Sequence, residues 1–175
     1  MKNLILALGL TIGAFINVNA QHNHSQHTTP AQAQQTTPKA TTAAEQLQLL
    51  YTHYLGIKDA LVAGNKEQAA THANGLSQTA SLISYRDLSE GNINALRKDA
   101  STIADAKDLA AQRKAFSILS SNISALAEKF KLSDKPVYQQ YCPMAKGYWL
   151  SNEKEIRNPY YGSSMLTCGS VKKTF

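Results

Sequence analysis

Apolar residues recur at spacings of three and four over residues 43–130, and this periodicity constrains the fold more than any other feature. Such a spacing places the apolar side chains along one face of an α-helix. Gly64-Asn65 and Gly91-Asn92 interrupt the pattern, as residues that end helices do. The pattern predicts four helices, over about 43–63, 66–84, 93–105 and 109–130. Because the connections are short, residues 43–132 are predicted to form an antiparallel four-helix bundle in an all-α fold.

The residues predicted to face the core are apolar on all four helices, apart from Lys58 and Arg113. The first helix contributes Leu47, Leu50, Tyr51, Tyr54, Ile57 and Leu61, with Lys58 as the one polar residue of the stripe. The second contributes Ala69, Ala73, Leu76, Ala80 and Ile83. The third contributes Ile93, Leu96, Ala100 and Ile103 or Ala104, and the fourth Arg113, Phe116, Leu119, Ile123, Leu126 and Phe130. Small residues in the second helix predict close helix packing.

The composition changes at Ser133-Asp134-Lys135-Pro136, after which aromatic and turn-forming residues are dense. No strand-like alternation is evident in this stretch. Dense turns with dense aromatics are typical of an ordered segment rather than a tail. Residues 138–175 are therefore predicted to be an ordered but irregular, aromatic-rich segment packed against the helices, completing a domain over 43–175.

Residues 1–20 have the three parts of a secretory signal peptide. Lys2 is followed by an apolar run from Leu4 to Ile16 and by the cleavage site Val18-Asn19-Ala20. The run is too short for an ordinary membrane span, and no cysteine follows it as a lipoprotein anchor would need. The mature product is expected to begin at Gln21, to carry no membrane anchor, and to be periplasmic or secreted.

Residues 21–42 contain no large apolar side chain and are rich in Thr, Gln, Ala and Pro. Such a composition predicts a flexible tether. It carries His22, His24 and His27, which could chelate Cu(II), Ni(II) or Zn(II) weakly as accessory ligands. The alternative is a polar tail whose histidines bind nothing.

The two cysteines and two methionines of the mature chain all lie in the last stretch, as Cys142, Met144, Met165 and Cys168. Thiolate and thioether sulfurs are soft donors that favour Cu(I) over harder ions. The set therefore predicts a soft-metal site for Cu(I), with Ag(I) as an alternative. Zinc is less favoured because thioethers are poor zinc ligands.

Two histidines of the helical region could approach these sulfurs, namely His53 and His72. His72 lies near the inner face of the second helix, where a lone histidine is usually a core residue. The competing interpretation of the cysteines is a Cys142–Cys168 disulfide, which an exported protein favours. Closing that loop of about 27 residues would stabilise the fold by roughly 3–3.5 kcal/mol. The residue types leave both interpretations open.

The C-terminal residues resemble the end of the DUF3347 family. The residues that carry the resemblance are Cys142-Pro143-Met144-Ala145, Gly147, Trp149-Leu150-Ser151, Ile156, Asn158-Pro159-Tyr160-Tyr161-Gly162, Met165-Leu166 and Cys168-Gly169. Residues 54–61 and 113–116 resemble the family's first and fourth helices, so the likeness covers about 45–175. The family has no assigned function, and its members occur alone after a signal peptide or fused to periplasmic adaptor subunits of heavy-metal efflux pumps.

That resemblance implies a periplasmic protein of a Gram-negative bacterium, linked to copper or silver handling, with an efflux adaptor or another envelope protein as partner. The alternative is an interaction domain stapled by a disulfide and without a metal role. Enzyme activity is not expected, because no nucleophile triad, phosphate loop or HExxH motif is evident. The net charge of +6 is scattered rather than clustered, so nucleic acid is not an expected partner.

Overall fold

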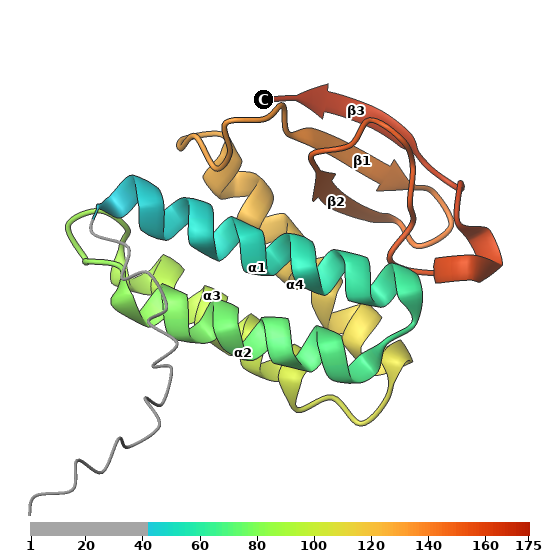
Figure 1. Cartoon of the computed structure of the whole chain (residues 1–175), viewed down its shortest axis with the longest axis horizontal. Coiled ribbons are helices and arrows are strands. Elements are labelled where there is room, and N and C mark those ends of the chain that lie inside the picture. The colour runs from blue at the N-terminus through green and yellow to red at the C-terminus, as the bar shows by residue number, and fades with distance from the viewer. Residues whose placement is uncertain (1–41) are drawn as a thin grey trace, which may run out of the picture. The chain divides into compact units, whose positions relative to one another are not determined.

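The computed structural model of the chain describes residues 42–175. The predicted signal peptide and the tether histidines His22, His24 and His27 lie outside these residues. Four helices, α1 (Ala43–Ala63), α2 (Lys66–Leu82), α3 (Glu90–Ala104) and α4 (Leu109–Ala127), are followed by strands β1 (Tyr138–Cys142) and β2 (Gly147–Ser151). The 3-10 turn η1 (Gly162–Met165) and strand β3 (Ser170–Thr174) complete the described part of the chain (Figure 1).

The four predicted helices are confirmed, and local capping explains where they begin and end. Thr42 and Glu45 form a reciprocal capping box at the start of α1, and Gly64 ends that helix at φ 72°. This left-handed conformation favours glycine. The predicted break at Gly91 is wrong, because Ser89 accepts a hydrogen bond from the Asn92 N–H and so starts α3 at Glu90. Polar caps at the true start outweigh one glycine in the first turn.

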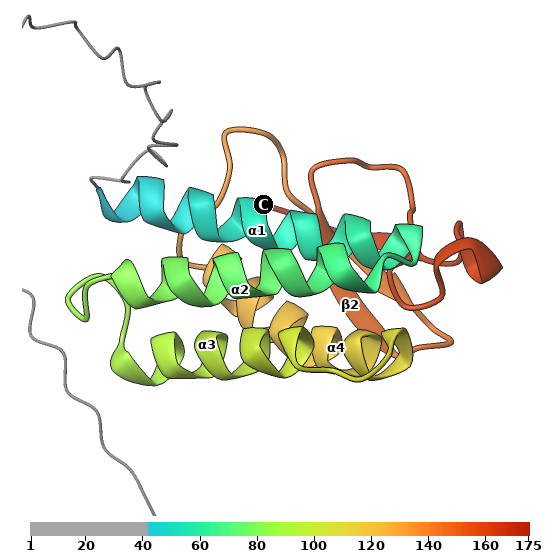
Figure 2. The ribbon, with the colours of Figure 1, turned by 60° about the horizontal axis from the view of Figure 1, so that its bottom comes forward.

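Each helix packs mainly against its neighbour in the sequence (Figure 2). On α1 and α2 every residue predicted to face inward is buried, including Lys58, whose ammonium lies 2.8 Å from the exposed Asp59 carboxylate. On α4 the predicted stripe is buried from Phe116 to Leu126, whereas Arg113 is only half-buried. The 3.6-residue period therefore predicted the helical core almost completely.

The C-terminal segment is a three-stranded antiparallel sheet with strand order β2-β1-β3. The predictions of an irregular segment and of an all-α class are therefore wrong in this part of the chain, and the domain is mostly helical with a small sheet. In β2, Trp149, Leu150 and Ser151 are buried in succession, because protein covers both faces of that strand. A strand covered on both faces shows no apolar alternation.

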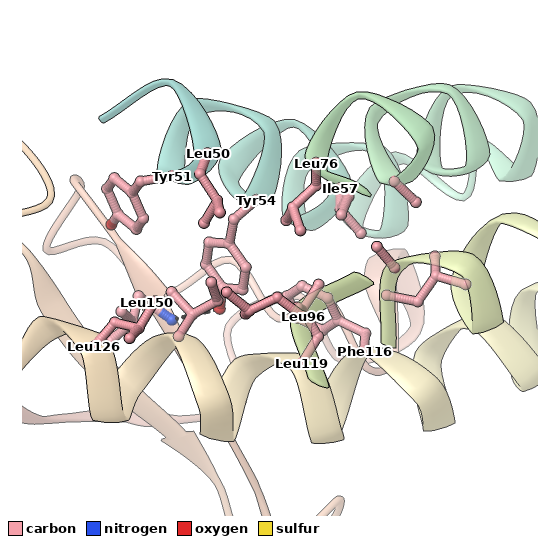
Figure 3. Packing of buried hydrophobic residues seen from close by; sticks show 14 of the residues in the cluster. Leu50, Tyr51, Tyr54, Ile57, Leu76, Leu96, Phe116, Leu119, Leu126 and Leu150 are labelled. Carbon is pink, nitrogen blue, oxygen red and sulfur yellow. Dashed lines mark hydrogen bonds between the residues drawn. The ribbon is translucent and has the colours of Figure 1, made fainter. Parts of the chain in front are cut away.

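The sheet is joined to the helices through the hydroxyl of Tyr54 on α1. This oxygen lies 2.8 Å from Ser120 Oγ of α4 and accepts a hydrogen bond of 2.9 Å from the Leu150 N–H of β2. Figure 3 shows Tyr54 between the helices with Leu150 on the side of Leu126. A second link is Arg113, whose guanidinium donates to the carbonyl oxygens of Leu61 and Pro159 at 3.1 Å each.

Three tyrosines of this core predict a sharp loss of stability in alkali. Burial raises the pKa of Tyr51 and of Tyr54 well above the usual value of 10, and raises the pKa of Tyr160 to about 12. Above pH 10 the unfolded chain loses these protons before the folded chain does, so stability falls as the pH rises from about 10. We expect these three phenols to ionise only as the protein unfolds.

The measurement is a pH titration of absorbance at 295 nm with circular dichroism in parallel. The part of the absorbance change that comes from Tyr51, Tyr54 and Tyr160 should appear only together with the loss of the helix signal. Ionisation of all eight tyrosines in one transition near pH 10, with the helix signal intact, would contradict this.

Candidate metal centre

The sheet brings the two cysteines together. Cys142 ends β1 and is fully buried, and Cys168 precedes β3 and is half-buried. Their Sγ atoms lie 3.9 Å apart and both thiols are free, whereas a disulfide bond is about 2.05 Å long. Two residues that are 26 positions apart in the sequence thus form one pair of adjacent sulfurs.

Strand register explains why Cys142 faces Cys168. Opposite residues of paired strands share a face of the sheet, and the pairs Gln140–Trp149 and Cys142–Gly147 therefore lie on one face. The segment between β2 and β3, which carries Cys168, covers this face. The Gln140 side chain holds it by donating to the carbonyl oxygens of residues 153–155 at 2.9–3.3 Å.

Asn158 fixes the position of the Cys168 backbone. Its side-chain N–H donates to the Cys168 carbonyl oxygen at 2.9 Å, and its Oδ1 accepts from the Tyr160 N–H at 2.8 Å. The Asn158 N–H donates to the carbonyl oxygen of Leu166, also at 2.8 Å. Asn158 is fully buried, so these bonds replace the water that its polar atoms would otherwise bind. Residue types alone predict no role for Asn158, although the Asn158-Pro159 pair in the aromatic block indicates a specific turn.

The two thiols differ in acidity. Burial raises the pKa of Cys142, but hydrogen bonds to its sulfur from the Ala145 N–H, Asn158, Cys168 and the Met144 backbone outweigh burial, so that the pKa is lowered overall. Burial, the hydrogen bond to Cys142 and the charge of that residue raise the pKa of Cys168. Cys142 is therefore the first of the two to form the thiolate, the form of cysteine that binds metals.

The two methionines are close to the cysteines in the sequence, and both are exposed. Met144 is in the turn between β1 and β2 and is 61% exposed, and Met165 ends η1 and is 38% exposed. The Cys168 N–H donates to the Met165 carbonyl oxygen at 3.1 Å, which ties that methionine to the site. Unbranched thioether side chains have three rotatable bonds and can adapt to a nearby ligand.

The spacing of the sulfurs suits one bridging ion. With metal–sulfur bonds of about 2.3 Å, sulfurs held 3.9 Å apart subtend an angle of roughly 115° at the metal, between trigonal and tetrahedral. Over residues 42–175, no group of three or more His, Cys, Asp or Glu side chains lies close enough together to hold a metal ion. The donors that the structure brings together are thus two thiols, with methionines two and three residues away in the sequence, a set that suits a soft cation.

The structure does not bring His53 and His72 to the sulfurs. The two imidazoles lie on α1 and α2 and neighbour each other, with ring centroids 6.1 Å apart. The accessory ligands predicted at His22, His24 and His27 lie outside the described residues. The sulfur set Cys142, Met144, Met165 and Cys168 is therefore the candidate centre, with Asn158 as a positioning residue.

A groove runs beside the centre, between α4 and the turn that follows Cys142. Its volume is about 570 Å³. The lining residues are Ala110, Arg113, Lys114, Ser117, Ile118, Ala145, Tyr160 and Tyr161. Ile118, one of these lining residues, is a large apolar side chain that is 59% exposed.

Comparison with known proteins gives one match. Residues 50–135 match the model of a family described as a protein of unknown function, DUF3347. The matched range spans most of α1, all of α2 to α4 and the connection to the sheet, and ends before β1. The resemblance of the C-terminal block therefore remains a prediction. Neither a curated protein nor a solved structure matches the chain. None of the helices within the described residues is long and apolar enough to span a bilayer.

Proposed function

This chain belongs to the DUF3347 family, and we propose that it is a soft-metal-binding protein that holds Cu(I), or Ag(I), between Cys142 and Cys168. The observation that carries the proposal is the pair of free sulfurs 3.9 Å apart. One of the two is acidified by the hydrogen bonds around it, so that a thiolate is available without a large movement of the backbone.

The surroundings of the pair suit Cu(I). Trp149 and Tyr160 are buried beside it, and apolar walls restrict the access of water and oxidants to a bound ion. Met144 and Met165, which are exposed, would supply additional soft donors to the ion. A half-exposed Cys168 leaves one side of the centre open, as a protein that takes up an ion and passes it on requires.

We place this activity outside the cytoplasm, in the periplasm or the extracellular medium, because residues 1–20 have the composition of an export signal. There the protein would buffer copper or silver, or deliver the ion to an adaptor subunit of a heavy-metal efflux pump or to another envelope protein. Support for this role comes from the C-terminal resemblance and the soft donor set. The helices are proposed to form an antiparallel four-helix bundle that supports the sheet.

The decisive experiment is competition for Cu(I) against a chromogenic chelator. The reduced mature protein is expected to bind one equivalent, and Cys142→Ser/Cys168→Ser is expected to lose more than about 100-fold in affinity, because removal of both ligands exceeds the loss seen for outer-shell residues. Met144→Leu and Met165→Leu are expected to give smaller losses.

Circular dichroism and the thermal midpoint of the cysteine double variant must show that it is folded, so that a loss of affinity is not a loss of structure. His22→Ala/His24→Ala/His27→Ala should retain the tight equivalent. Equal, weak binding by wild type and the cysteine double variant would assign the copper to the tether histidines and refute the proposal.

A second candidate function, a disulfide-stapled interaction domain without a metal role, is favoured by the groove beside Cys142. In that case oxidation would join Cys142 and Cys168, and Lys114 and Ile118 would contact an envelope partner. Native mass spectrometry distinguishes the two functions. Loss of two hydrogens in protein isolated from its own compartment, with no copper uptake after reduction, would support the interaction domain.

A further inference from the structure

We propose that His53 and His72 form a second metal site, between α1 and α2, for a divalent first-row transition metal ion. Imidazole nitrogen suits Cu(II), Ni(II) and Zn(II). The site is independent of the sulfur centre in both its ligands and its place in the fold. Its ligands are held by packed helices.

The two histidines occupy equivalent places on the two helices. Each is followed three residues later by a glycine, as His53–Gly56 on α1 and His72–Gly75 on α2. A Cβ added to Gly56 would lie 2.4 Å from His72 Nδ1, and one added to Gly75 would lie 2.4 Å from His53 Cε1. Each imidazole thus fills the space that the missing side chain of the opposite helix leaves.

This packing of each imidazole against the opposite helix explains why glycine occurs inside α1 and α2. Glycine is the least favourable helix residue after proline, so a glycine in the middle of a helix usually has a packing reason. Here both glycines allow an imidazole to approach the opposite backbone. The rings are consequently positioned by the helix contact rather than by side-chain rotation alone, which lowers the entropy lost when they bind an ion.

The separation of the rings fits one bridging ion. A metal–imidazole bond is about 2.0–2.1 Å long, and each nitrogen lies roughly 1.15 Å from its ring centroid. An ion held between two imidazoles therefore sets the centroids at most about 6.4 Å apart, when the two nitrogens lie on opposite sides of the ion. The observed centroid distance is 6.1 Å, with the ring planes at 55°. The rings thus lie within the distance that one ion can bridge once a nitrogen of each ring turns toward it, with water to fill the remaining positions.

The protonation state also suits a ligand. Burial and the neighbouring His72 lower the pKa of His53, so this imidazole is neutral at pH 7 and offers a lone pair. Both residues are half-buried, which leaves water and ions access to the rings. Among residues 42–175 neither imidazole is engaged in a hydrogen bond, so their nitrogens are not committed to another protein group.

Ni(II) is the probe, because unlike Cu(II) it does not oxidise the thiols. The full mature chain carrying His22→Ala/His24→Ala/His27→Ala is titrated, so that the tether contributes nothing. We expect binding of one Ni(II), a rise in the thermal midpoint because the site exists only in the folded state, and at least a 10-fold loss of affinity in His53→Gln or His72→Gln.

A measurement on the unaltered helices covers the case in which a histidine variant fails to fold. In NMR spectra of the same tether variant, Ni(II) should selectively broaden the ring protons of both His53 and His72, and should do so equally in Cys142→Ser/Cys168→Ser. Broadening of neither ring, or affinity unchanged in both folded histidine variants, would overturn the proposal. Because Cu(I) binding by the cysteines is measured separately, failure of one site leaves the other unaffected.

Discussion

Replacing Trp149 by alanine is expected to destabilise the fold by about 3–5 kcal/mol, the range for deletion of a buried aromatic side chain. Trp149 is fully buried and packs edge-on against Tyr160, with ring centroids 6.0 Å apart. It also supports the backbone beside Cys168, because a Cβ added to Gly169 would lie 2.8 Å from its ring. The variant should lower the urea midpoint of unfolding and weaken Cu(I) binding as well.

Trp149→Phe is the matched control for the loss of volume. The Trp149 Nε1 atom is buried without a partner among the described residues, so phenylalanine removes no hydrogen bond and keeps a ring. The loss in the free energy of unfolding should therefore be clearly smaller for Trp149→Phe than for Trp149→Ala, measured by denaturant unfolding followed by circular dichroism. Equal midpoints for the wild type and Trp149→Ala would show that the sheet contributes little to stability.

The second large effect is expected from Tyr54→Phe, which removes a single oxygen atom. That oxygen is bound to Ser120 Oγ and to the Leu150 N–H, and all three groups lie in the core. A buried donor or acceptor left without a partner costs about 1–3 kcal/mol. We expect a loss of this size in the free energy of unfolding, with faster amide hydrogen exchange at Leu150, because β2 loses its polar link to α1.

The control is a double-mutant cycle with Ser120→Ala. Removing the serine hydroxyl as well takes away one of the two unsatisfied groups, so the double variant should cost less than the sum of the two single changes. Additive costs, together with unchanged hydrogen exchange at Leu150, would mean that Tyr54 does not join the sheet to the helices.

The helices could be predicted from the sequence because each of them buries one face of apolar side chains. Ile57 and Leu76, for example, are buried at positions that the 3.6-residue period places on the inner face. The start of α3 differs from the prediction because Gly91 resembles a helix break in the sequence, whereas Ser89 caps the helix before it. Local polar caps decide such boundaries, and they are weaker signals than apolar periodicity.

The sheet was missed for a different physical reason. β1 buries the polar Gln140, whose amide donates to backbone carbonyl oxygens, and β2 buries Trp149 and Leu150 side by side. β3 has a single apolar residue, Val171, which is only half-buried. None of the strands therefore shows the alternation of polar and apolar residues from which a strand is predicted.

The donor set of the candidate centre was evident from residue types, but its geometry was not. Nothing in the spacing of Cys142 and Cys168 predicts a separation of 3.9 Å, because strand register and the covering segment determine it. Asn158 and the pairing of His53 with His72 both depend on tertiary contacts. Contacts of this kind become visible only when the elements are placed in space.

The link from Tyr54 to Leu150 has a consequence for the time course of folding. It joins residues 96 positions apart, whereas the helices contact mainly their sequence neighbours. Contacts close in sequence form sooner than distant ones, so we expect the helices to assemble first and the sheet to dock last. Until it docks, Cys142 and Cys168 are separate thiols on a mobile strand and loop, open to reaction with other molecules. Rapid docking would therefore protect newly synthesised chains from intermolecular disulfides.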